Sequence, residues 1–316
     1  MASSVTASGQ LLSAEPPREA KLGWWEHVSL VSVRFVAKAL LACVSLRGLY
    51  RFARAFGTLE WLLDYRRRRR FARALSEVLG ETPTAKERRR ATREFFMQSR
   101  CDKLFYLVFD CIKADQGRAL FSISNRRLLD EAVARGRGVY VAMSHHGALH
   151  IVAMLLTLQG YKAALVRDGR EAALRRYVQN RLESSYPELG AMRVIFADQY
   201  PRPIYRCFRD GYMLGSALDV SRVRHSSQKM EWVEIFGKKR PFLTGPMRIA
   251  LRCGAPVLQG FVVPESDFRY RLEIVEMLVD SNEISDEGDA VARAIPVYAA
   301  NVERHVRAWP SLLTRI

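Results

Sequence analysis

Three of the six histidines in this 316-residue chain stand close together, at His145, His146 and His150. An imidazole gains or loses a proton near neutral pH, so a histidine can act as a general base toward a hydroxyl group. His146 and His150 are also one helical turn apart, a spacing that suits two ligands of one metal ion. The metal interpretation is the weaker one, because no third ligand lies nearby and the glutamate of a metalloprotease helix is missing.

The residues around these histidines predict the elements that position them. Residues 139–143 are a continuous apolar run bounded by glycines and by Ser144, which favours a strand buried on both faces. Residues 151–158 then resemble a buried helix that ends at Gly160. The histidines should therefore lie at the carboxyl end of a strand, where ligands and catalytic groups collect in open α/β sheets.

Strand and helix patterns alternate through much of the chain and predict an α/β fold, with a largely parallel central sheet flanked by helices. Further strands are expected at 162–166, 194–197, 212–220, 232–236 and 257–263, with an edge strand at 269–275. Helices are expected at 84–113, 125–134, 174–182, 205–209 and 291–309, and an acidic loop at 280–289. Another helix should begin at Thr244, with Thr244 as its cap and Pro246 in its first turn, and run to Cys253.

The N-terminal part divides into three segments. Residues 1–20 are rich in Ala, Ser and Pro and lack the pattern of a secretory signal, so we expect a disordered lead-in. Residues 21–65 are expected to be a helical segment at the membrane interface, and residues 66–316 the α/β domain.

An amphipathic helix from Trp24 to about Arg54 is the basis of the interface prediction. Arg34 and Lys38 interrupt its apolar run, so a membrane-spanning helix is not expected. Paired tryptophans, an apolar face and a basic stripe are typical of a helix lying in the interface. The alternative is a helix that packs on the core and has a solvated basic edge. The basic stripe is expected to comprise Arg34, Lys38, Arg47, Arg51 and Arg54.

The charge of the chain indicates an anionic partner. Fifty Lys and Arg residues outnumber 33 Asp and Glu residues, so the net charge is +17. The five arginines at 66–70 lie next to the predicted interface helix, where they would attract anionic lipid headgroups. No nucleic-acid-binding motif is present, so no nucleic acid partner is expected.

Five cysteines without a CxxC pair favour reduced thiols in the cytosol.

Several short segments form an ordered series around the histidines, with His-x-Gly, Phe-Gly, Thr-Gly-Pro, Leu-Ala and Gly-Ala-Pro patterns. From about Lys21 to Trp309 the chain resembles the bacterial late acyltransferases of lipid A synthesis, the lauroyl and myristoyl acyltransferases, and the related phosphatidylinositol mannoside acyltransferases. The segments that carry the resemblance are Glu131–Val139, Ser144–Gly147, Val166–Arg167, Glu234–Gly237, Leu243–Leu251 and Gly254–Pro256.

The resemblance implies transfer of a fatty acyl chain to a hydroxyl of a membrane glycolipid or phospholipid. The donor would be a thioester of acyl carrier protein or coenzyme A, with no cofactor. It also implies a peripheral or monotopic protein at the cytoplasmic face of the inner membrane, in contact with anionic lipids.

The family motif places an Asp or Glu five positions after its histidine, and here that position is His150. If His145 is the base, Asp219 could supply the missing carboxylate, because it ends a later predicted strand and the mannoside enzymes use an acid in a similar region. The other two interpretations are that His150 binds a ligand, or that the protein is a non-catalytic lipid-binding relative.

Further substrate contacts are predicted at strand and helix ends. Arg167 ends a strand, where it would contact substrate or form a surface salt bridge. A basic cluster in a loop after a strand, Lys238, Lys239 and Arg240, suits a phosphorylated lipid or the phosphopantetheine of a carrier. Thr244, Gly245 and Arg248 are secondary candidates. The chain has no Gly-x-Ser-x-Gly motif, which favours direct attack by the acceptor without an acyl-enzyme.

Overall fold

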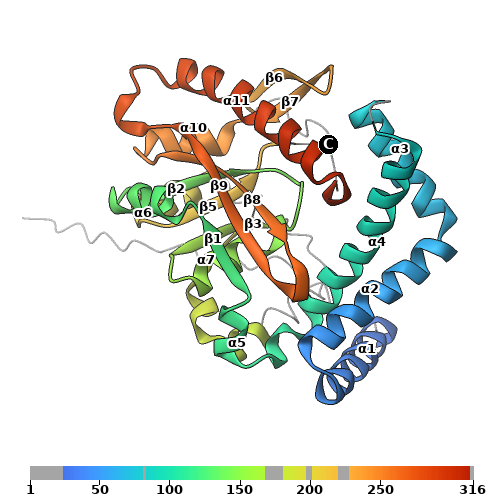
Figure 1. Cartoon of the computed structure of the whole chain (residues 1–316). Helices are drawn as coiled ribbons and strands as arrows, with labels where there is room; N and C mark the ends of the chain where they lie inside the picture. Colours follow the sequence, from blue (N-terminus) through green and yellow to red (C-terminus); the bar gives the residue numbers. More distant parts are fainter. Residues whose placement is uncertain (1–23, 81–82, 168–180, 197–200, 220–227, 314–316) are drawn as a thin grey trace, which may run out of the picture.

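The computed structural model describes residues 24–80, 83–167, 181–196, 201–219 and 228–313. In this part of the chain a seven-stranded sheet has the order β1-β9-β8-β2-β5-β3-β4 (Figure 1). β2 runs parallel to β5 and β8, β3 runs parallel to β4 and β5, and β8 pairs antiparallel with β9. The predicted α/β fold with a largely parallel sheet is confirmed. The strands are β1 (Phe121–Ser124), β2 (Val139–Met143), β3 (Ala163–Arg167), β4 (Arg193–Phe196), β5 (Met213–Ala217), β8 (Val257–Pro264) and β9 (Tyr270–Val279).

β2 lies in the interior of the sheet and is buried on both faces, as predicted. Alternate side chains of a strand point to opposite faces. Val139, Val141 and Met143 accordingly join one hydrophobic core, whereas Tyr140 and Ala142 join the other. Helices α4 (Ala85–Val108), α6 (Arg126–Ala134) and α7 (Val152–Leu158) contribute to the first core. Helices α9 (Arg202–Arg209), α10 (Gly245–Arg252) and α11 (Glu287–Ala308) contribute to the second.

Two strand predictions need correction. The segment predicted as an edge strand is β9, which lies between β1 and β8, because the short strand β1 covers its outer side. The basic residues expected in a loop lie in a strand, β7 (Lys238–Leu243), which forms a hairpin with β6 (Met230–Ile235). Phe236 and Gly237 both have positive φ values, 53° and 67°, which is the geometry of a tight hairpin turn. The helix predicted at 174–182 lies largely outside the described residues.

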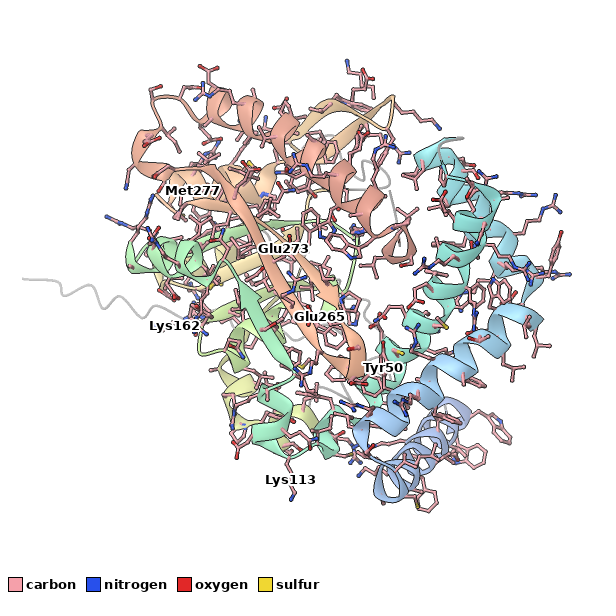
Figure 2. The ribbon with its side chains drawn as sticks, in the orientation of Figure 1. Tyr50, Lys113, Lys162, Glu265, Glu273 and Met277 are labelled. Carbon is pink, nitrogen blue, oxygen red and sulfur yellow. The ribbon has the colours of Figure 1, made fainter. Side chains whose placement is uncertain are left out.

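The N-terminal segment is two helices and not the single one predicted. α1 (Trp24–Cys43) ends before Ser45, whose hydroxyl accepts a hydrogen bond from the Gly48 N–H and caps α2 (Leu46–Leu63). The arginine run lies in α3 (Tyr65–Leu79), and α1 to α4 stand together at one side of the sheet (Figure 1). Tyr50 of α2 lies near the turn that joins β8 to β9 (Figure 2), and its ring packs edge-on against Phe268. No helix of the described chain has the length and apolarity that a bilayer crossing requires.

The predicted basic stripe on the N-terminal helices is wrong for Arg34 and Arg54. Arg34 is 4% exposed and forms an ion pair with Asp110, while Arg54 pairs with Glu94 of α4. Both arginines therefore point toward the body of the protein. Large apolar side chains of α1 and α2 are exposed instead: Trp24, Trp25, Val28, Val31, Val33, Phe35, Val36, Phe52, Phe56, Leu59, Leu62 and Leu63.

Candidate active site

His145 and Asp219 meet at the carboxyl ends of two neighbouring parallel strands. Met143 and Ala217, the last residues of β2 and β5, pair with each other, and each of the two site residues stands two positions beyond the end of its strand. The Nδ1 atom of His145 lies 2.9 Å from the main-chain oxygen of Asp219 and 3.2 Å from its Oδ1 atom. The His145 N–H also donates to both carboxylate oxygens, at 3.0 and 2.9 Å. The structure thus brings together the two residues that the sequence analysis paired.

The turn that carries His145 explains the His-x-Gly pattern. Gly147 has a φ of +82°, and a Cβ atom there would lie 2.4 Å from the main-chain oxygen of Val262 in β8. A side chain at this position would meet both the backbone strain and the clash. The N–H groups of Ala148 and Gly147 donate to the oxygens of Val262 and Leu312, at 2.9 and 3.1 Å. The backbone after His145 is therefore held by β8 and by the C-terminal segment.

The geometry assigns the proton on the His145 ring. Both described partners of Nδ1 are oxygens that accept, so in the neutral ring Nδ1 carries the hydrogen and Nε2 carries the lone pair. The His145 side chain is 33% exposed, whereas that of Asp219 is 8% exposed. Burial raises the pKa of the Asp219 carboxyl, and the hydrogen bonds and charge of His145 oppose this shift. A partly exposed imidazole on a buried carboxylate can remove a proton from a hydroxyl group and hold it as imidazolium.

Other elements fix the strand ends beneath this pair. Asp219 forms an antiparallel bridge with Phe242 of β7, and the Leu243 N–H donates to the oxygen of Leu218 at 2.7 Å. From α11, the Tyr298 hydroxyl donates to the oxygen of Met143 at 2.6 Å. The β6–β7 hairpin therefore supports Asp219, and α11 supports the end of β2.

The structure separates the two histidines that were considered as metal ligands. His150 is exposed in a 3₁₀ turn, with its ring 6.4 Å from that of Tyr106 in α4. His146 is buried, with its ring 5.1 Å from that of His305 in α11. Among the described residues, no group of three or more His, Cys, Asp or Glu side chains is placed to hold a metal ion.

The predicted basic contacts differ in their distance from the pair. Arg167 is the last residue of β3, and its side chain lies outside the description. Lys238 and Lys239 are exposed at the start of β7. Lys238 is four residues before Phe242, which corresponds to about 13 Å along a strand. The structure therefore does not bring these lysines to Asp219, and the half-buried Arg240 lies between them and the bridge.

Thr244 and Arg248 have structural partners, and Gly245 begins a helix. Thr244 is at the cap position of α10, but its hydroxyl donates to the oxygen of Lys229 at 3.2 Å and does not cap the helix, contrary to the prediction. Gly245 follows it as the first residue of α10, with Pro246 in the first turn as predicted. The Arg248 guanidinium binds Glu231 of β6 at 2.8 Å and lies 3.4 Å from Glu287 of α11.

A buried aromatic cluster next to the site was not predicted. The His305 ring stacks on Phe261 with centroids 3.9 Å apart and lies 4.3 Å from the ring of Trp309. Burial lowers the pKa of His146 to about 3 and that of His305 to about 4, so both rings are neutral at pH 7. The sequence did carry a signal for His305, because it falls on the apolar stripe of the predicted helix 291–309 together with Val291, Ile295, Tyr298 and Val302. Nothing in the sequence indicated that the Tyr298 hydroxyl reaches β2.

Comparison with known proteins gives a family match. The family model for bacterial lipid A biosynthesis acyltransferases matches residues 26–316, which include every strand of the sheet and both residues of the pair. A search among curated proteins finds no significant match. The match extends over nearly the whole chain, and we conclude that the protein belongs to the bacterial lipid A biosynthesis acyltransferase family.

Proposed function

We propose that this protein transfers a fatty acyl chain from a thioester to a hydroxyl of a membrane glycolipid or phospholipid, with His145 as the general base. The family supports acyl transfer in lipid A biosynthesis. The observation that carries the assignment of the base is the contact of His145 Nδ1 with Asp219, which directs the lone pair of the neutral ring to Nε2. The donor is acyl carrier protein or coenzyme A carrying the acyl chain.

In the proposed step, His145 Nε2 takes the proton of the acceptor hydroxyl as the hydroxyl oxygen bonds to the thioester carbonyl carbon. The carbon–sulfur bond then breaks, and its electron pair leaves on sulfur. The Nε2–H returns the proton to the thiolate, so the products are an ester and a free thiol, and the base is regenerated. Asp219 stabilises the imidazolium while it exists.

Direct attack by the acceptor is preferred over an acyl-enzyme. Ser144 is the hydroxyl nearest to His145 in sequence, but it is fully buried and its Oγ atom accepts a hydrogen bond from the His146 N–H. A hydroxyl held in this way is a poor nucleophile. The sequence also lacks the nucleophile motif of serine hydrolases.

Asp219 compensates for the histidine at the acidic position of the family motif. The motif acid would give the base a negative partner, and here Asp219 supplies that charge from the adjacent strand. For this reason we favour an active enzyme over a non-catalytic lipid-binding relative. Arg167 remains a proposed substrate contact at the same edge of the sheet.

We also propose that the protein acts at the cytoplasmic face of the inner membrane. The exposed apolar side chains of α1 and α2 would enter the bilayer interface, and the net charge of +17 would attract anionic lipids. Within the arginine run, Arg66, Arg69 and Arg70 are exposed to such a surface. Arg67 and Arg68 are held by Glu60 and by the oxygen of Trp61.

The test is an acyl transfer assay with purified protein, both thioester donors and extracted glycolipids, followed by mass spectrometry of the products. His145→Ala should lose about a hundredfold to ten-thousandfold in rate. His146→Ala should keep most of the rate, because the buried ring of His146 has no described role in proton transfer. Near-normal transfer by His145→Ala, or inactivity of His146→Ala in a folded protein, would contradict the assignment.

A further inference from the structure

A basic hollow lies between α2 and α4, and none of its lining residues is assigned to acyl transfer. It has a volume of about 410 Å³ and opens to solvent. Figure 1 shows the two helices side by side at one flank of the molecule. We call this feature the α2–α4 hollow; it is lined by Arg54, Ala55, Thr58, Arg90, Arg93, Glu94 and Met97.

Close packing of the two helices shapes the hollow. A Cβ atom on Gly57 would lie 2.6 Å from the Cα atom of Met97, so a larger residue there would force the helices apart. Beside this contact, the Arg54 guanidinium binds both oxygens of Glu94, at 2.5 and 3.0 Å. The Thr58 hydroxyl donates to the main-chain oxygen of Arg54 at 3.1 Å. The inner wall is therefore fixed and close to neutral.

The rim of the hollow is positive. Arg90 and Arg93 are exposed on successive turns of α4, and Arg93 Nη2 lies 3.5 Å from the Thr58 hydroxyl. Because Glu94 is matched by Arg54, the rim arginines leave the hollow with a net charge of +2. The surroundings have the same sign, since residues 46–108 hold 16 Lys and Arg against 7 Asp and Glu. Guanidinium groups bind phosphate oxygens through paired hydrogen bonds, so the rim suits a phosphate group.

An apolar ridge runs along the neighbouring face of α2. Phe52, Phe56, Leu59 and Leu63 recur at helical spacing and are each between 45% and 74% exposed. Phe56 and Leu59 directly follow the hollow residues Ala55 and Thr58, and one residue rotates a helix by about 100°. The ridge and the hollow are therefore adjacent on one helix, as the acyl chains and the phosphate are adjacent in a phospholipid.

We propose that the α2–α4 hollow binds the phosphate headgroup of an anionic phospholipid while the apolar ridge enters the acyl region of the same leaflet. A free phosphate would not require the ridge. The inference rests on the proposed function for its membrane setting, and it places the bound leaflet against α2 and α4.

The test compares two double variants of the full-length protein by sedimentation with vesicles, without any acyl donor. Arg90→Gln with Arg93→Gln removes the rim charges. Lys162→Gln with Arg293→Gln removes the same charge from exposed positions outside α1–α4; Lys162 lies on the opposite side of the molecule from Tyr50 of α2 (Figure 2). The vesicles are phosphatidylcholine alone, or phosphatidylcholine with a minority of phosphatidylglycerol.

The rim variant should lose about tenfold or more in affinity for the anionic vesicles and keep its affinity for the neutral ones. The control variant should lose about twofold or less for either kind. Phe52→Ser with Phe56→Ser should weaken binding to both kinds, because it removes part of the ridge. Circular dichroism should show that each variant is folded, because all of the changed positions are exposed.

Three results would overturn the proposal. Equal losses of affinity for anionic vesicles in the rim and control variants would show that the overall charge of the protein attracts the lipid and that the hollow is not a binding site. Binding of inorganic phosphate to the wild type but not to the rim variant, with equal vesicle affinity for the two proteins, would make free phosphate the ligand. Loss of acyl carrier protein binding in the rim variant, with vesicle binding intact, would assign the hollow to a protein partner. A wild type that binds vesicles through the hollow but transfers no acyl chain would contradict the proposed function alone.

Discussion

The Asp219 carboxylate contacts His145 at two places, the main-chain N–H and the ring nitrogen Nδ1. The N–H lies 3.0 and 2.9 Å from the two oxygens, and Nδ1 lies 3.2 Å from Oδ1. One side chain thus sets both the path of the backbone after β2 and the tautomer of the ring. Asp219 therefore has a positioning role as well as an electrostatic one.

The buried charge of Asp219 should reduce stability. A carboxyl group whose pKa is raised by folding makes an unfavourable contribution to stability wherever it is ionised, and this contribution disappears as pH falls toward the unfolded value of about 3.9. Asp219→Asn should therefore unfold at an equal or higher urea concentration than the wild type at pH 7, and this advantage should shrink toward pH 4. Denaturation curves across this range measure it. A large loss of stability at pH 7 would show that the hydrogen bonds of the carboxylate outweigh its burial.

Gly147 should be needed for activity beyond its effect on stability. Gly147→Ala places a Cβ atom 2.4 Å from the Val262 oxygen at a φ of +82°, so the turn must shift and move His145. Gly211→Ala is the matched control, because Gly211 has a φ of +76° with open space around its Cβ position. In both variants an alanine must adopt a positive φ value, and this backbone strain should lower the free energy of unfolding by about 1–3 kcal/mol. Thermal unfolding and initial rates should show loss of acyl transfer for Gly147→Ala only; equal rates for the two variants would refute the role of the turn.

The buried pair of His146 and His305 should make the protein sensitive to acid. Their pKa values, about 3 and about 4, lie below the unfolded value near 6.5. The unfolded chain therefore binds more protons below pH 6.5, and stability should fall by up to about 1.4 kcal/mol per pH unit for each ring.

His305→Phe keeps the stack on Phe261 and removes one of these protons, so the pH dependence of the unfolding free energy between pH 6 and pH 4 should become shallower. Glu273 faces the His305 ring, with its Oε2 atom 3.9 Å from Nε2, and stays in place in the variant. Trp309→Phe is the control, because it alters the same stack without removing a titrating group. An unchanged pH dependence in His305→Phe would contradict the assignment of a neutral buried ring.

His150 should tolerate the residue that the family motif carries. The side chain is exposed and Asp219 already supplies a carboxylate to His145, so His150→Glu should change the rate of acyl transfer by only about twofold. Initial rates with one donor and one acceptor measure this. If His150→Glu lost both its activity and a bound metal ion, His150 would be a metal ligand.

The sequence predicts the parts of the site that depend on local pattern. The apolar run at 139–143 predicts a strand buried on both faces, and the structure has this strand as β2. The largely apolar segment before Asp219 predicts another strand, which is β5. The sequence placed Asp219 at the end of a later strand, on the same edge of the sheet as His145, but it did not show that β2 and β5 are neighbours. The hydrogen bonds from the His145 N–H to Asp219 depend on the register of these strands, which no local pattern specifies.

The predictions that were wrong concern residues whose contacts are with residues distant in the sequence. Arg34 has the helical spacing of a surface stripe, and its ion pair with Asp110, 76 residues away, could not be read from that spacing. The segment 238–243 lacks strand periodicity, and its pairing with β6 depends on the turn at Phe236 and Gly237. Thr244 looked like a helix cap, but its hydroxyl donates instead to the oxygen of Lys229, 15 residues earlier.

The most direct test of the account is a double-mutant cycle on kcat for acyl transfer with His145→Ala, Asp219→Asn and the double variant. If Asp219 acts through the His145 ring, each single variant should lose at least about a hundredfold, and the double variant should be no slower than His145→Ala. Losses that multiply in the double variant, or a wild-type rate for Asp219→Asn, would contradict the central claim that these two residues form one catalytic unit.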